Sequence, residues 1–213
     1  MRRSMPKGLK WVFTVWIAIW VPLYWSAYGP INFLWMCDMA NLILLIAIWR
    51  ENRLWISAQA VGVFLIQCVW TLDVLCRWLL GFHLVGGTEY MFDPAISIFL
   101  RALSFFHLIM PFLFFWLLGN FGYHPRGWII QSMYGAVLLT ASYGLGGPEL
   151  NLNWVYAPFG LQQTWISPFG YLIFCLFAYP MLIFFPTHRL FIWIFGSIGD
   201  RRVARSPKRN PAT

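Results

Sequence analysis

Six long apolar runs restrict the fold of this chain more than any other feature. Each run has about 18 residues or more, which is enough to cross a hydrocarbon core of ~30 Å. Only 10% of the 213 residues are charged, against about 25% in soluble domains. Helices are the expected form of each run, because unpaired backbone groups are costly in lipid. We therefore predict an all-α membrane protein, a six-helix transmembrane bundle with spans at about 11–28, 31–49, 55–80, 94–118, 127–145 and 167–195.

The ends of these spans carry their own signals. Gly29-Pro30 predicts a tight turn between the first two spans, and Asp93-Pro94 is typical of a helix start. The first run is long and has no clear small-residue cleavage site, so we interpret it as an uncleaved signal anchor. The chain is predicted to form one transmembrane domain over 1–198, followed by a basic cytoplasmic tail over 199–213.

The net charge of +8 comes mainly from the two ends of the chain. One set of connections contains Arg50, Arg53 and Arg126, whereas the opposite set contains no Lys or Arg. This bias predicts that both termini are cytoplasmic, in a bacterial cytoplasmic (inner) membrane. The expected partner is membrane lipid and not nucleic acid, and the sequence leaves the oligomeric state open.

The four cysteines all lie in apolar runs, and no CxxC, HxxxH or HExxH pattern occurs. We therefore expect neither a disulfide framework nor a metal site, and no cofactor.

Charged residues within the spans are costly and are expected to face the interior of the bundle. At ~1.5 Å per residue, Asp38, Asp73 and Arg101 each lie about 10 Å from the outer end of their helix, in one layer. Asp73 and Arg77 are spaced for an ion pair. Two interpretations stay open. The layer is either a set of structural ion pairs or a polar cavity in which Arg77 or Arg101 holds an anionic headgroup.

Cys37 is the only cysteine beside a carboxylate, that of Asp38. A buried cysteine usually acts as a small hydrophobe, and an ionised neighbour disfavours the thiolate. A nucleophilic Cys37 therefore needs a separate base, for which His107 on span four is the candidate. Ser104, one turn earlier, is placed to orient His107, although a histidine in a span also serves as a packing residue.

The connection over 146–166 is rich in aromatic and amide side chains, among them Asn153, Trp154 and Tyr156. It is expected either to fold back as a lid or to form an aromatic belt at the membrane interface.

Several segments resemble YwaF-like integral membrane proteins, whose animal relative is a transmembrane acyltransferase of ether phospholipids. They are Leu34-Trp35-Met36-Cys37, Phe105 to Pro111 around His107, and Asn153-Trp154-Val155-Tyr156 followed by Ser167 to Tyr171. The androgen-induced-gene family of fatty-ester hydrolases is more distantly similar. The resemblance implies Cys37 as acyl-accepting nucleophile and His107 as general base. The chain departs from that pattern at Trp35, where the family has histidine, and at Trp154, where it has tyrosine.

Three hypotheses follow for the function. The first is lipid acyl transfer or ester hydrolysis, in which Cys37 attacks an acyl carbonyl and Asn41 and Asn153 donate to the oxyanion. The second is a non-catalytic scaffold or complex subunit with a structural polar layer. The third is a protein that binds a lipid or a quinone.

Overall fold

The structure, a computed structural model, describes residues 4–204, and of Gly160 and 197–204 it describes the backbone alone. All regular structure in this part of the chain is helical, which confirms the all-α prediction. The main helices are α1 (Lys7–Tyr28), α2 (Met36–Trp49), α3 (Arg53–Leu80), α4 (Ile98–Leu103), α5 (Phe106–Phe121), α6 (Gly127–Leu150), α7 (Pro168–Ala178) and α8 (Phe185–Ala204). The short elements are η1 (Pro30–Leu34), η2 (Glu89–Met91), η3 (Leu152–Trp154), η4 (Pro158–Gly160) and η5 (Tyr179–Phe184), the last of which is π-helical.

Four helical stretches are long and apolar enough to cross a membrane: Lys7–Tyr28, Arg53–Leu80, Ile98–Phe121 and Pro168–Gly196. Their outward side chains are large and apolar, as on Trp193, Trp78 and Phe112, which are 80%, 73% and 71% exposed. Such a surface is compatible with an integral membrane protein, because lipid and not water then covers it.

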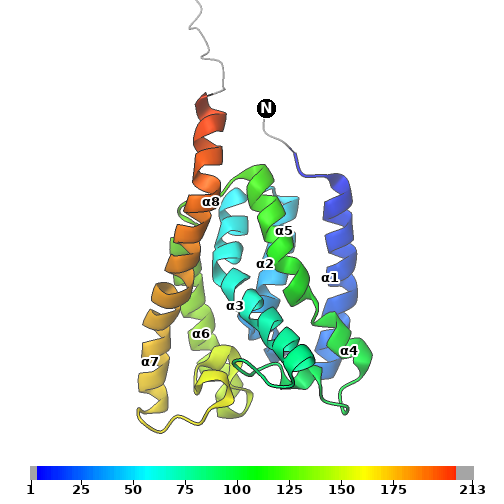
Figure 1. Ribbon diagram of the computed structural model, residues 1–213, viewed down its shortest axis with the longest axis vertical. Coiled ribbons are helices and arrows are strands. Elements are labelled where there is room, and N and C mark those ends of the chain that lie inside the picture. The colour runs from blue at the N-terminus through cyan, green and yellow to red at the C-terminus, as the bar shows by residue number, and fades with distance from the viewer. Residues whose placement is uncertain (1–3, 205–213) are drawn as a thin grey trace, which may run out of the picture.

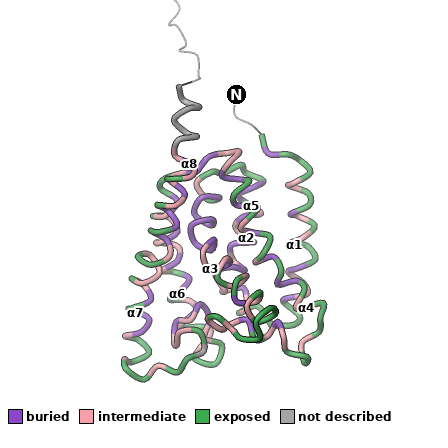
Figure 2. Tube along the Cα trace, viewed as in Figure 1, coloured by how far each residue is buried: buried purple, intermediate pink, exposed green. Residues whose placement is uncertain are grey.

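Helix α3 is the centre of the bundle and packs against α2, α5 and α6 (Figures 1 and 2). Its first half is buried on every side, from Ser57 to Val63. Small residues allow this: a Cβ on Gly62 would lie 2.3 Å from the Gln131 amide of α6, and one on Gly127 would lie 2.9 Å from Ser57. Close approach of backbones through small residues is how helices associate in lipid.

The connections gather at two ends of the bundle (Figure 1). The start of α1, the α2–α3 turn and the α5–α6 turn lie at the upper end in this view, and η1, the 81–97 segment and the 151–167 segment lie at the lower end. Glu51 joins the start of α1 to the α2–α3 turn, because its carboxylate accepts from Lys10 Nζ at 2.7 Å and from the Met5 amide at 3.1 Å.

Two predicted spans are interrupted. In the second, η1 ends at Leu34 and α2 begins only at Met36, so Trp35 breaks the run and α2 keeps 14 residues. In the fourth, the helix is interrupted between the end of α4 at Leu103 and the start of α5 at Phe106, and Asp93-Pro94 does not begin α4. The Asp93 carboxylate instead closes a turn by accepting from the Ala95 amide, and Ser97 caps α4.

The other predicted span ends lie nearer to the helix ends of the structure. Helix α1 ends at Tyr28, and the positive φ of Gly29 (75°) confirms a turn there. Helix α6 runs on to Leu150 through a kink at Gly147, and α7, η5 and α8 follow one another without a break. The predicted basic tail lies outside the residues whose side chains are described.

Candidate functional site

Cys37 and His107, the expected nucleophile and base, have different recorded partners in the structure. Among the described residues, no hydrogen bond, ring contact or charge interaction joins the two side chains. The Cys37 thiol is buried in the core and lies within electrostatic reach of Asp38 and of the Tyr179 hydroxyl on η5. The expected thiol–imidazole couple is therefore not formed, because the two helices present these side chains to different neighbours.

His107 is held as a packing residue. Its ring stacks on Trp70 and Phe106, with centroids 4.6 and 4.0 Å away. Nδ1 lies 2.8 Å from the Ser104 carbonyl oxygen and must donate its proton to it, since a carbonyl only accepts. The Ser104 contact to His107 is made by its backbone carbonyl, while its hydroxyl bonds Tyr24 at 2.7 Å.

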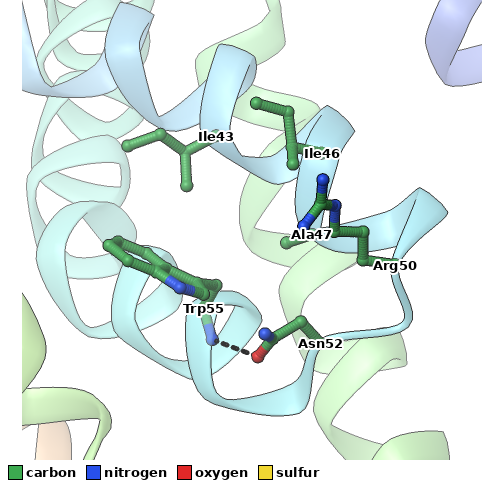
Figure 3. A pocket seen from close by; sticks show the side chains of 6 residues that line it. All are labelled: Ile43, Ile46, Ala47, Arg50, Asn52 and Trp55. Carbon is green, nitrogen blue, oxygen red and sulfur yellow. Dashed lines mark hydrogen bonds between the residues drawn. The ribbon is translucent and has the colours of Figure 1, made fainter.

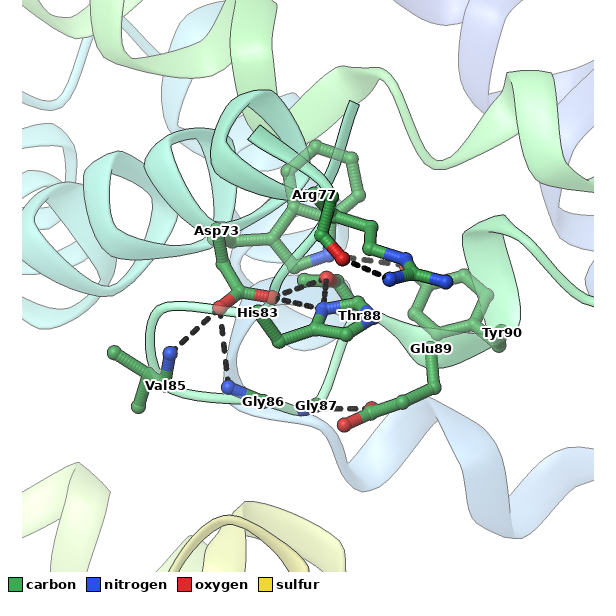
Figure 4. A network of polar contacts seen from close by, with 11 residues as sticks. Asp73, Arg77, His83, Val85, Gly86, Gly87, Thr88, Glu89 and Tyr90 are labelled. Atoms are coloured by element: carbon green, nitrogen blue, oxygen red, sulfur yellow. Dashed lines mark hydrogen bonds and ion pairs between the residues drawn. The ribbon is translucent and has the colours of Figure 1, made fainter. Parts of the chain in front are cut away.

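Asp73 is the centre of the densest polar network in the described chain (Figure 4). One oxygen accepts from the amides of Val85 at 2.7 Å and Gly86 at 3.0 Å. The other accepts from the Thr88 hydroxyl and lies 2.8 Å from His83 Nδ1. The side chain of Asp73 is 1% exposed, so this carboxylate is buried and paired by one loop.

The predicted Asp73–Arg77 ion pair is wrong. Arg77 turns to the Gly81 carbonyl and lies over the Phe92 ring, because Asp73 is already saturated by the loop that follows α3. Arg101 makes no ion pair either and donates to the Met91 carbonyl at 3.0 Å. The predicted layer of Asp38, Asp73 and Arg101 contains no ion pair among its three members. Asp73, Arg77 and Arg101 instead hold one segment, 81–93.

Asp38 is a separate case. It lies in the first turn of α2, is 4% exposed and accepts from Asn32 Nδ2 at 2.9 Å. A carboxylate in the first turn of a helix interacts favourably with the positive end of the helix dipole. Asp38 is therefore stabilised by its position and by η1, and no arginine side chain that the structure describes is its partner.

Asn41 and Asn153, the expected oxyanion donors, differ in their partners. Asn41 Nδ2 bonds the Cys37 carbonyl one turn back. Asn153 joins two distant segments: its Oδ1 accepts from the Met36 amide at 2.7 Å, and its Nδ2 donates to the Leu34 carbonyl at 2.7 Å and to Ser142 at 2.8 Å. Asn153 thus supplies the cap that Trp35 cannot give α2.

The 151–160 segment folds back onto the bundle. Leu152, Asn153 and Val155 are buried. Trp154 packs edge-on against Trp35 at 5.4 Å, and its ring occupies the place where a Cβ on Gly87 would lie, 2.7 Å away. The two loops of this end therefore touch each other.

Tyr156 fastens the same segment to α6. Its ring stacks on Tyr143 at 4.6 Å, and its hydroxyl donates to the Tyr143 carbonyl at 2.7 Å. Together with Asn153 and Trp154 it covers the lower end of the bundle.

The arrangement of this end orients one imidazole, that of His83. His83 Nδ1 faces the Asp73 carboxylate, which leaves Nε2 free, and the side chain is 21% exposed. His83 is not among the predicted site residues, and the only signal in the sequence is its position ten residues after Asp73, across the Gly81 turn. No cluster of three or more His, Cys, Asp or Glu side chains suited to a metal ion occurs among the described residues.

The comparisons with known proteins add no relative, since the chain matches no protein-family model, no curated protein and no solved structure.

Proposed function

We propose that this chain is an integral membrane protein with six crossing segments and both termini on the cytoplasmic side of a bacterial inner membrane. In this arrangement α2 with η1 and α6 cross beside α3, in addition to the four long apolar stretches. The charge bias supports it: Lys10, Arg53 and Arg126 belong to the end that holds the start of α1.

We further propose a non-catalytic role, as a scaffold or subunit of a membrane complex. One observation carries this proposal: the polar side chains placed for chemistry are occupied by structural bonds. Asp73, Arg77 and Arg101 hold the 81–93 segment, and Asn153 holds the junction of η1 and α2. A closed end of this kind is better suited to a protein that binds partners through its surfaces than to an enzyme that must admit a substrate.

The two departures from the YwaF-like pattern support the same conclusion. Trp35 stands where the resemblance implies a histidine two residues before the cysteine, and Trp154 stands where it implies a tyrosine. In this chain the two indoles pack against each other at 5.4 Å. The place of the missing base is filled by an aromatic contact, and Cys37 has no other base within hydrogen-bonding reach among the described residues.

The test is reactivity of Cys37 toward an acyl-lipid probe with a thiol-reactive group. We expect Cys37 to label no faster than the buried Cys175, and Cys37→Ala to leave the complex unchanged. His107→Ala is expected to lower stability, because it removes the ring contacts to Trp70 and Phe106, without changing the labelling of Cys37. Asp73→Ala is expected to lower stability and to release partners. Selective labelling of Cys37 that disappears in His107→Ala would instead establish acyl transfer.

A further inference from the structure

A groove between α2 and α3 opens at the end of the bundle opposite the Asp73 network. Its volume is about 270 Å³, and its lining residues are Ile43, Ile46, Ala47, Arg50, Asn52 and Trp55 (Figure 3). The walls are aliphatic and aromatic, whereas the mouth carries one cation and one amide. The groove is smaller than most small-molecule pockets, which begin at about 300 Å³. The groove therefore suits part of one extended hydrocarbon chain better than a compact cofactor.

The mouth of the groove lies at the level of an aromatic belt. Trp11 packs edge-on against Trp49 at 5.3 Å, and Trp49 donates to Thr14 at 2.9 Å. Trp55, on the wall of the groove, belongs to the same end of the bundle. Tryptophan gathers at the boundary between headgroups and hydrocarbon. Arg50 is thus placed where lipid phosphates lie.

Arg50 is the uncommitted cation of this turn. Glu51, its acidic neighbour, is bound to Lys10 and to the Met5 amide. Arg53 donates to the Tyr123 carbonyl at 3.0 Å. Within the described residues Arg50 has no hydrogen bond or ion pair from its guanidinium, and it is exposed. Asn52 uses its Oδ1 to cap α3, which leaves its Nδ2 as a second donor.

We propose that this groove binds an anionic phospholipid, with one acyl chain along Ile43, Ile46 and Ala47 and the phosphate on Arg50. A guanidinium matches phosphate by two parallel hydrogen bonds, and it is less strongly hydrated than an ammonium. Arg77 and Arg101 of the opposite end are less available, because each already donates to a backbone carbonyl. The proposal needs only that the bundle is embedded in a membrane, and it is independent of the scaffold role.

The test is native mass spectrometry of the purified chain, released from micelles that contain phosphatidylglycerol and phosphatidylcholine with identical acyl chains. We expect the wild type to retain phosphatidylglycerol preferentially. Arg50→Gln is expected to weaken phosphatidylglycerol binding about fivefold, the effect of one cation near anionic lipid, and to leave phosphatidylcholine unchanged. Ile46→Trp, which fills the groove from an exposed position, is expected to weaken both lipids.

Arg126→Gln is the matched control, since Arg126 is an exposed cation of the same end that does not line the groove. It should bind as the wild type does. Equal loss in Arg126→Gln and Arg50→Gln would overturn the proposal in favour of general surface charge, as would equal retention of the two lipids by the wild type. If Ile46→Trp fails to fold, phosphatidylglycerol with a photoreactive acyl chain replaces it: crosslinks within residues 43–55 support the site, and crosslinks only elsewhere refute it.

Discussion

Asp73 orders a loop that begins about two helical turns further along the chain. Its carboxylate accepts from Val85, Gly86 and Thr88 and faces His83, although it is in the apolar helix α3. Hydrogen bonds to a charged group are worth more than neutral ones, about 1.5–3 kcal/mol each, and a donor left unpaired in a buried place costs about 1–3 kcal/mol. A single residue therefore decides whether the 83–88 loop is closed.

We predict that Asp73→Ala lowers the free energy of unfolding by about 3 kcal/mol, because four donors lose their acceptor. Asp73→Asn should cost less, since its Oδ1 still accepts from Val85 and Gly86. Unfolding in mixed micelles with a denaturing detergent measures both, and hydrogen exchange of 81–88 should rise with them. Asp93→Ala is the control, since this carboxylate accepts only from Ala95. Equal losses for Asp73→Ala and Asp93→Ala would contradict the assignment.

Glu51 makes the start of α1 sensitive to pH. The hydrogen bond from the Lys10 ammonium, followed by that from the Met5 amide, lowers the pKa of Glu51. A lowered pKa means that the contact is complete above the ordinary carboxyl range near pH 4.3 and is lost as the pH falls through the lowered value. Hydrogen exchange of residues 5–10, corrected for its intrinsic pH dependence, should rise at acid pH. Glu51→Gln should show this faster exchange already at neutral pH. If the exchange rates of residues 5–10 in Glu51→Gln and the wild type differ by the same factor at every pH, Glu51 is not the pH-sensitive group.

At the scale of elements, the breaks between helices determine how the end of the bundle is built more than the helix lengths do. Helix α2 begins at Met36 because Trp35 adopts an extended conformation (φ −56°, ψ 130°), and its first amide is capped from Asn153, more than a hundred residues away. Asn153 itself has a positive φ of 50°, which asparagine tolerates better than most residues. Two connections that are distant in sequence are thereby joined into one end of the bundle.

Asn153→Ala is expected to lower the free energy of unfolding by about 2 kcal/mol, since it removes a buried cap and adds strain at a positive φ. Asn153→Gly removes the same side chain without that strain, so the difference between the two isolates the backbone contribution. Asn153→Asp keeps the acceptor for Met36 but buries a carboxylate oxygen against the Leu34 carbonyl, and should cost at least as much as Asn153→Gly. Stability of Asn153→Gly equal to that of the wild type would show that the cap is dispensable.

At the scale of the whole molecule, the central question is whether α2 and α6 cross the membrane. Six crossings place the α2–α3 turn on the side of the N-terminus, and the 81–93 loop on the opposite side. If only the four long stretches cross, both segments change sides. The two arrangements therefore differ at every connection from α2 to α6.

We predict that a fluorescent protein fused after Asn52 or Pro125 is fluorescent in the cytoplasm, and that a phosphatase fused after Gly87 or Gln163 is active outside. Positive charge beside the first two positions favours their retention in the cytoplasm. Phosphatase activity after Asn52 would refute six crossings. Four crossings would place the 81–93 and 151–160 segments, which touch each other at Gly87 and Trp154, on opposite sides of the membrane.

The sequence by itself determined the helical, membrane-compatible character of this protein. Long apolar runs with few charges can satisfy their backbone in lipid only as helices, and Gly29 ends the first of them as its freedom at positive φ allows. These properties are local, so spacing and residue type were enough to predict them.

Only the tertiary structure decided what the polar residues do. Spacing along α3 favoured an Asp73–Arg77 pair, but the 83–88 loop offered four donors and Arg77 found a carbonyl. Resemblance favoured Cys37 with His107, but Trp70 and Phe106 enclose the imidazole. A buried polar group takes whichever partner the fold brings within about 3 Å, and that partner came from loops whose path no local pattern describes.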